Sequence, residues 1–307
     1  MKLLMSSPRG FCAGVERAIK VVDEALELLE HPIYVNHEIV HNSHVIKKFQ
    51  DQGVIFVEGL QDVPDNSSLI FNAHGVPPAL IREAKSKNLR VVDATCPLVS
   101  KVHFEAIRYA KNGFDIVLIG HEGHSEVIGV VGEAPEKIFL VETLADVDKL
   151  TFPEDHKLAY ITQTTLSIDD CAVIIQRLKE RYPTIEVPKK SDICYATTNR
   201  QTAIKQISVE ADIVLVVGSQ NSSNSNRLCE VAQKEGTTAY LVNDATELKK
   251  EWFTGNEKVG ITAGASTPED IIDSVSTWLK ENFDVTECKD VVVIKEDEHF
   301  NLPKIGD

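Results

Sequence analysis

A short segment that carries one cysteine occurs three times in this 307-residue chain. In each copy an extended apolar stretch runs into the cysteine, and a helix-forming run begins within a few residues after it. The copies contain Cys12, Cys96 and Cys194. The repeat favours three small domains. One cysteine at the same place in each copy indicates that three thiolates meet at one point.

The stretches between these cysteines share one order of elements. A helix leads to a strand and a polar loop, and further strands lead to a second polar loop, a helix and the next cysteine. Strands that alternate with helices predict parallel sheets, with ligands bound beyond the carboxyl ends of the strands. We therefore predict an α/β fold of three small units related by pseudo-threefold symmetry.

The predicted units span residues 13–96, 97–190, and 191–284 together with 1–12. The third stretch lacks a last strand and a cysteine of its own, and the N-terminal strand with Cys12 would supply both. The ends of the chain would then close on each other as a ring. The tail at 285–307 is expected to add a strand, with a mobile end as the alternative.

The spacing between the cysteines and the first polar loops supports this alignment. The separations are 29, 28 and 30 positions, from Cys12 to His41, from Cys96 to His124 and from Cys194 to Asn224. The cysteines and both polar loops of every unit fall at carboxyl ends of predicted strands. Nine segments are thus expected to face one cavity.

Composition excludes several classes of protein. Hydrophobic residues make up 43% and charged residues 26%, and no apolar run is long enough to span a membrane. The net charge of −15 argues against nucleic acid, which needs clustered Lys and Arg, but permits a small anionic ligand. The N-terminus does not resemble a signal peptide, so we expect a cytoplasmic protein whose six cysteines form no disulfide framework.

The three repeated cysteines are suited to a metal centre. The start of a helix and a metal ion both favour thiolate over thiol, and Pro97 directly after Cys96 is typical of a first helical position. Three thiolates leave one open position on a four-iron, four-sulfur cluster or on a tetrahedral zinc. The alternative is that they are small core residues, which is our interpretation of Cys171, Cys229 and Cys288.

Histidines and one carboxylate occupy the polar loops of the first two units. His41, His74 and His124 each follow a predicted strand, and three at matched positions favour an anion or proton site over ordinary surface histidines. Glu126 is two residues from His124 in the loop at 120–126 and could act as an acid there. The alternative for Glu126 is a solvated loop carboxylate.

Hydroxyl and amide side chains occupy the corresponding loops of the third unit. Ser222, Ser223 and Asn224 follow the buried strand predicted at 213–217, at the start of a helix, where they could donate to phosphate oxygens. Ser266 lies in a similar loop of small residues, and Thr164 offers a further hydroxyl in the second unit. The alternative, a polar linker, fits poorly with so abrupt a change after a buried strand.

Five motifs point to one known family: PRGFCAGV at 8–15, DATCPLV at 93–99, GHEGH at 120–124 with Glu126, CYATTNRQ at 194–201, and NSSNSNR at 221–227. The sequence closely resembles the LytB (IspH) family of hydroxymethylbutenyl diphosphate reductases over essentially the whole chain. We find no departure from the family pattern at the candidate site positions.

The resemblance implies a trefoil with a central [4Fe–4S] cluster held by Cys12, Cys96 and Cys194, whose fourth iron binds the substrate hydroxyl. Glu126 would be the proton source, acting with Thr164 and His124. The residues implied to bind substrate are His41, His74, His124, Thr164, Ser222, Ser223, Asn224 and Ser266.

The implied reaction is reductive dehydroxylation of (E)-4-hydroxy-3-methylbut-2-enyl diphosphate to isopentenyl and dimethylallyl diphosphate, the last step of the methylerythritol phosphate route to isoprenoids. A ferredoxin or flavodoxin would deliver electrons to a monomer. Two alternatives remain at this stage. One is a cluster-dependent hydratase, and the other is a non-redox, zinc-containing phosphate-binding protein.

Overall fold

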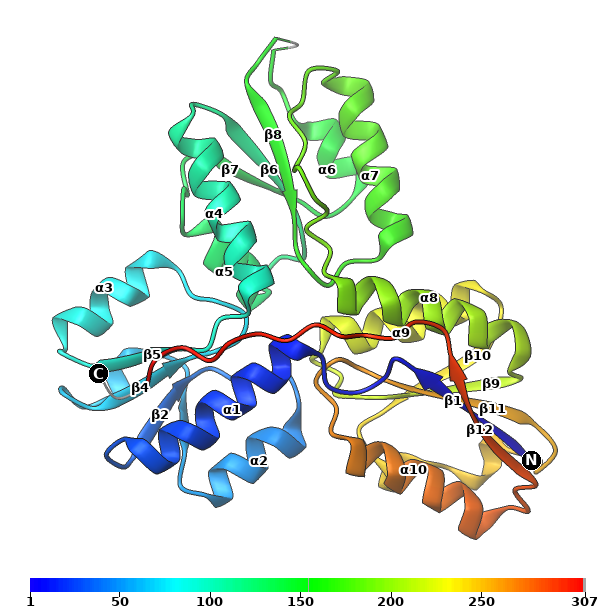
Figure 1. Ribbon diagram of the computed structural model, residues 1–307. Helices are drawn as coiled ribbons and strands as arrows, with labels where there is room; N and C mark the ends of the chain where they lie inside the picture. Colours follow the sequence, from blue (N-terminus) through cyan, green and yellow to red (C-terminus); the bar gives the residue numbers. More distant parts are fainter. Residues whose placement is uncertain (154, 306–307) are drawn as a thin grey trace. The chain divides into compact units, whose positions relative to one another are not determined.

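The computed structural model describes residues 1–153 and 155–305 (Figure 1). This part of the chain contains three sheets, of five, four and three strands, and every pairing within them is parallel. α-Helices connect most successive strands, and the remaining connections contain short 3₁₀ turns. The predicted α/β class with three mainly parallel sheets is confirmed.

The four-stranded sheet has the order β3-β2-β4-β5. Its strands are β2 (Ile33–Asn36), β3 (Ile55–Val57), β4 (Ser68–Phe71) and β5 (Arg90–Asp93). The helices in this region are α1 (Ala13–Leu28), α2 (Ser43–Asp51) and α3 (Pro78–Ser86).

The three-stranded sheet has the order β7-β6-β8. Its strands are β6 (Asp115–Ile119), β7 (Ile138–Val141) and β8 (Leu158–Thr162). Its helices are α4 (Pro97–Lys111), α5 (Ser125–Val131), α6 (Leu144–Lys149) and α7 (Ile168–Arg181). The strand predicted near Ile185 is present only as an isolated parallel bridge between Glu186 and Ala159.

The five-stranded sheet has the order β10-β9-β11-β1-β12. Its strands are β1 (Lys2–Ser7), β9 (Ile213–Val217), β10 (Thr238–Val242), β11 (Lys258–Ala263) and β12 (Glu287–Val292). Its helices are α8 (Tyr195–Glu210), α9 (Ser223–Lys234) and α10 (Glu269–Asn282). The prediction that the N-terminal strand completes this sheet is confirmed by the pairing of β1 with β11, and the tail adds β12 beside β1.

The same strand order recurs in the three sheets. In each sheet, one strand directly follows the helix that begins after a repeated cysteine: β2, β6 or β9. That strand pairs on one side with the next strand of the chain and on the other side with the strand after it. The chain forms two compact units. One comprises Met1–Glu16, Val40–Lys48 and Tyr195–His299, and the other Arg17–Ile39, Phe49–Cys194 and the chain from Phe300. The boundaries of the three smaller domains remain predictions.

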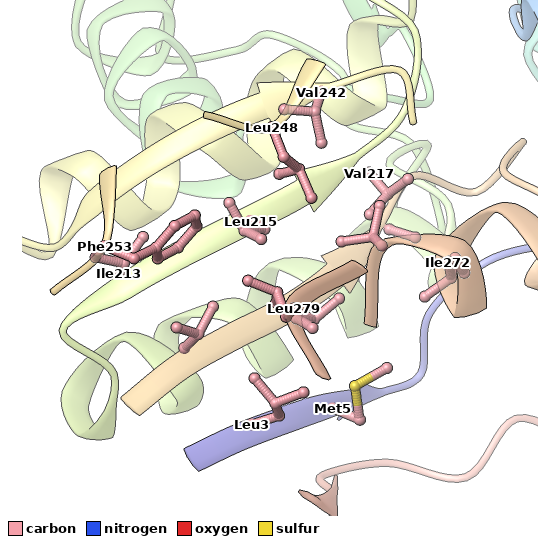
Figure 2. Packing of buried hydrophobic residues seen from close by; sticks show 14 of the residues in the cluster. Leu3, Met5, Ile213, Leu215, Val217, Val242, Leu248, Phe253, Ile272 and Leu279 are labelled. Carbon is pink, nitrogen blue, oxygen red and sulfur yellow. The ribbon is translucent and has the colours of Figure 1, made fainter. Parts of the chain in front are cut away.

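The apolar run of β9 is buried because helices cover both faces of its sheet. Side chains alternate along a strand, so Ile213, Leu215 and Val217 join a cluster with β1, β11 and α10 (Figure 2). Val214 and Val216 point the other way into a cluster with α8 and α9. α10 therefore covers one face, and α8 and α9 the other (Figure 1).

No helix within the described residues is long and apolar enough to cross a membrane.

Candidate functional site

The three repeated cysteines lie at the starts of helices, as predicted. Cys12 directly precedes α1, Cys96 is the N-cap residue of α4 with Pro97 as its first residue, and Cys194 directly precedes α8. None of the three forms a disulfide, and all three are half-buried. A helix start carries partial positive charge, so the three sulfur atoms share one kind of electrostatic surrounding.

A backbone hydrogen bond of one kind holds all three cysteines. The amide of Cys12 donates to the carbonyl of Ala265 at 3.1 Å, that of Cys96 to Ala73 at 3.0 Å and that of Cys194 to Thr164 at 3.0 Å. Each acceptor lies two residues beyond the end of a strand: β11, β4 and β8, respectively. Every cysteine is thus fixed to the second polar loop of its own sheet by equivalent atoms, which the sequence alone did not reveal.

The convergence of the three thiolates stays a prediction. Cys96 and Cys194 belong to one compact unit and Cys12 to the other. Among residues 1–153 and 155–305, no group of three His, Cys, Asp or Glu side chains is arranged to hold a metal ion. What the structure contributes is the equivalent placement of each cysteine within its own unit.

Glu126 is a buried carboxyl group in the first turn of α5. Its side chain is 2% exposed, so the prediction of a loop position is wrong and the solvated alternative does not apply. The backbone N–H of Thr164 donates to Glu126 Oε1 at 2.7 Å, and Thr164 Oγ1 donates to Oε2 at 2.8 Å. Burial raises the pKa of Glu126 to about 7, although both hydrogen bonds from Thr164 act in the opposite direction.

His124 caps the helix that carries this carboxyl group. Its Nδ1 accepts from the backbone N–H of Glu126 at 3.1 Å, which leaves the ring proton of the neutral form on Nε2. The ring of His74 meets that of His124 edge to face, with centroids 6.0 Å apart. One compact unit therefore brings together His74, His124, Glu126 and Thr164, and Thr164 also accepts from the amide of Cys194.

The hydroxyl and amide residues gather in the other unit, where α9 starts. Ser222 is its N-cap and accepts from the backbone N–H of Ser225 at 3.3 Å. Asn224 is 6% exposed, and its Nδ2 has no hydrogen-bond partner among the described residues. Ser223 is half-buried in the same turn. The buried amide is a donor for which a ligand oxygen is a suitable acceptor.

The segment at 40–48 packs against these loops within the same compact unit. Ser266 Oγ donates to the carbonyl oxygen of His41 at 2.9 Å, and the backbone N–H of Ser43 donates to Ser219 Oγ at 3.2 Å. The contact fixes the backbone of the predicted ligand His41 beside the loop of Ser266. The predicted site residues of this unit are thus His41, Ser222, Ser223, Asn224 and Ser266, together with Cys12.

Comparison with known proteins decides the family. The sequence pattern of the LytB protein family matches residues 3–280. The chain belongs to the LytB family. The resemblance stated from the motifs is confirmed.

Relatives of this LytB protein are named 4-hydroxy-3-methylbut-2-enyl diphosphate reductase. One from Rhodopirellula baltica is 53% identical over 99% of this chain and 95% of its own length. Another from Protochlamydia amoebophila is 52% identical over 99% of this chain and 97% of its own length. Both comparisons span nearly full length.

Two solved structures are similar to this LytB protein. The E-1-hydroxy-2-methyl-but-2-enyl-4-diphosphate reductase from Plasmodium falciparum has a TM-score of 0.93 and 45% identity, covering 99% of this chain and 94% of that one. An (E)-4-hydroxy-3-methyl-but-2-enyl diphosphate reductase, described as the terminal enzyme of the non-mevalonate pathway, has a TM-score of 0.66 and 32% identity. The match covers 92% of this chain and the whole of that one.

Sequence reasoning missed a buried charged group in this LytB protein. Asp192 accepts from Lys101 Nζ at 2.7 Å and from the backbone N–H of Thr162 at 3.0 Å, which ties the loop before Cys194 to α4. Burial, and then the neighbouring Asp192, raise the pKa of Glu105 to about 7. The only signal in the sequence was the short spacing of Asp192 from Cys194.

Proposed function

We propose that this LytB protein reduces (E)-4-hydroxy-3-methylbut-2-enyl diphosphate to isopentenyl diphosphate and dimethylallyl diphosphate. The reaction breaks the allylic C–O bond, takes up two electrons and two protons and releases water. Family membership and relatives of the same name over nearly full length support the proposal. The structural observation that carries it is the buried carboxyl of Glu126, hydrogen-bonded to Thr164 in the loop that holds Cys194.

An allylic hydroxyl group is a poor leaving group, so an acid has to protonate it as the C–O bond breaks. The pKa of Glu126 near 7 means that a large fraction of this group carries a proton at neutral pH, yet gives it up readily. When protonated, the carboxyl of Glu126 can donate a hydrogen bond to Thr164 Oγ1. The hydroxyl proton of Thr164 then points away from Glu126. Thr164 would in this way pass a proton toward the substrate while His124 holds the start of α5.

The residues that would hold a metal cofactor are Cys12, Cys96 and Cys194. Three cysteines outside any disulfide, at helix starts and fixed by equivalent backbone hydrogen bonds, fit a cluster with three protein ligands. We propose a [4Fe–4S] cluster with one open iron, which when bound would supply Lewis acidity and a path for electrons. We also propose a ferredoxin or flavodoxin as donor, a monomeric enzyme and a cytoplasmic location.

The diphosphate is proposed to bind to histidines of both units and to the start of α9. Ser222, Ser223, Asn224 and Ser266 offer hydroxyl and amide donors, and the buried Asn224 Nδ2 without a partner supports an acceptor at this position. His41, His74 and His124 would add positive charge when protonated. This set explains how a chain of net charge −15 can bind a diphosphate without a cluster of Lys or Arg.

The test is an anaerobic assay with the diphosphate substrate and a chemical reductant such as dithionite with methyl viologen. The proposal predicts a brown protein that contains iron and acid-labile sulfide and forms both isoprenoid diphosphates. Turnover that persists when the reductant is withheld would indicate a hydratase. A colourless, zinc-only protein that binds the substrate without converting it would overturn the redox assignment.

A further inference from the structure

One buried histidine lies outside the predicted site. His103 is in α4, two helical turns after Cys96, and is 8% exposed. It shares the buried face of the helix with Val99, Val102 and Ala106. A histidine on an apolar face is usually a core residue, so its polar contacts decide whether it has a further role.

The ring of His103 is anchored at one nitrogen only. Its Nδ1 lies 2.7 Å from Oε1 of Glu133, which directly follows Gly132, the C-cap residue of α5. Its Nε2 is buried and has no hydrogen-bond partner within the described part of the chain. The pair therefore joins the middle of α4 to the end of α5.

The other edge of the ring lies beside two glycines, in the space that a side chain would occupy. A Cβ atom at Gly75 would lie 2.8 Å from His103 Nε2, and one at Gly129 would lie 3.2 Å from the same atom. Gly75 follows His74, and Gly129 is one turn after Glu126 in α5. Glycine at both positions thus allows the imidazole to approach the loop of one predicted substrate ligand and the helix of the predicted acid.

The charge of this histidine also acts on Glu126. A protonated His103 lowers the pKa of Glu126, whereas the carboxylate of Asp192 raises it. Both effects are smaller than that of burial. Titratable groups on the elements around Glu126 include His74 after β4, His124 and Glu133 at the two ends of α5, and Asp192 before Cys194. On α4 they include His103, and also Lys101 and Glu105, which lie beside Asp192.

We propose that His103, anchored by Glu133, is a positioning residue that fixes α5, which carries Glu126, and the His74 loop against α4. The inference rests on the proposed function and adds a residue that tunes its acid. The ring is held by Glu133 and lies beside Gly75 and Gly129, so its effect would be exerted through Glu126 and His74.

The test compares His103→Asn with Glu133→Gln in the full-length holoenzyme. Asparagine keeps an N–H for Glu133 but removes the ionisable ring and its outer edge. Glutamine keeps an acceptor for His103 Nδ1 but removes the carboxylate that anchors the ring. Both variants are expected to move the alkaline limb of the kcat profile upward by about 0.5 to 1 pH unit, since Glu126 then retains its proton to higher pH. His103→Asn should also lower kcat at pH 7 about tenfold, because it loosens the geometry.

A matched control is His156→Asn, which removes another histidine–carboxylate pair from the same compact unit. His156 Nε2 lies 2.7 Å from Oδ2 of Asp115, at the first residue of β6 and so at the opposite end of the sheet from the site. This variant should leave the pH profile unchanged. A loss of kcat in His103→Asn with an unmoved alkaline limb in both test variants would reduce His103 to a packing residue and overturn the inference.

An infrared titration separates this inference from the proposed function. The carbonyl band of protonated Glu126, assigned by its loss in Glu126→Gln, can be followed against pH without substrate or turnover. It should persist to higher pH in His103→Asn and Glu133→Gln than in the wild type. An unchanged midpoint in both refutes the tuning role even in an active enzyme, whereas an inactive wild type with the expected midpoints refutes only the reaction.

Discussion

Replacement of Glu126 by glutamine tests the buried acid through both stability and turnover. The pKa of this carboxyl is raised from 4.5 to about 7, so ionisation of Glu126 is less favourable in the folded protein than in the unfolded chain. Well below pH 4.5 the group is protonated in both states. As pH rises from 4.5 through 7 the unfolded chain loses its proton first, and the folded state loses stability relative to it.

The size of this effect follows from the shift. At about 1.4 kcal/mol per pKa unit, the ionised group costs the folded protein about 3 kcal/mol above pH 7. Glu126→Gln removes the ionisable group while keeping an acceptor for the Thr164 N–H. We therefore compare the free energy of unfolding of the variant with that of the wild type at two pH values. The difference between them should shift in favour of the variant by up to about 3 kcal/mol from pH 5 to pH 8.5.

Urea unfolding at the two pH values measures the stability difference, and anaerobic turnover measures catalysis. Loss of the transferable proton is expected to lower kcat by about 10² to 10⁴ while the iron content stays that of the wild type. The reasoning fails if the stability difference between variant and wild type is the same at pH 5 and pH 8.5. Near-normal turnover would reject Glu126 as the proton source.

Three further changes test other parts of the site. Asn224→Ala should raise KM about tenfold with a smaller change in kcat, because one hydrogen bond to a charged oxygen of the substrate is lost. An unchanged KM in steady-state kinetics would mean that Asn224 does not contact the diphosphate. Lys101→Met should lower the free energy of unfolding, measured in urea, by about 2 kcal/mol, because it leaves the buried Asp192 without its cation. Lys149→Met is the control: it removes only an exposed ion pair and should have almost no effect. Substrate affinity should fall from pH 5 to pH 9 as the predicted histidine ligands lose charge; calorimetry that finds a constant Kd would exclude them as the source of positive charge.

The sheets and the cysteine positions could be predicted because they rest on local patterns. Apolar runs such as 213–217 form strands buried on both faces, and each repeated cysteine falls where a strand gives way to a helix. The completion of the third sheet by β1 followed from counting the strands of each repeat. These signals lie within a few residues of one another in the sequence.

One predicted strand is almost absent for a local reason. Pro183 and Pro188 flank the segment near Ile185, and proline cannot donate to a strand ladder. Glu186 alone makes both bonds to β8, through its N–H to Leu158 and its carbonyl from Tyr160. The pairing is therefore a single bridge rather than a strand.

The contacts that define the acid could not be predicted from the sequence. Glu126 and Thr164 are on separate elements, and nothing local indicates that the carboxyl is buried. The helix that carries it was missed because His124 replaces a more usual capping residue and glycines at 123, 129 and 132 weaken the helical pattern. His103 was missed because a buried histidine on an amphipathic helix has the same pattern as a core residue.

The central claim is that three equivalent cysteines hold one iron–sulfur cluster. The most direct measurement is the iron and acid-labile sulfide content of anaerobically purified Cys12→Ser, Cys96→Ser and Cys194→Ser, beside Cys229→Ser as the control from α9. The account predicts about four irons and four sulfides per chain in the wild type and the control, and a marked loss in each of the three variants. Wild-type content in any of the three, or an equal loss in the control, would contradict it.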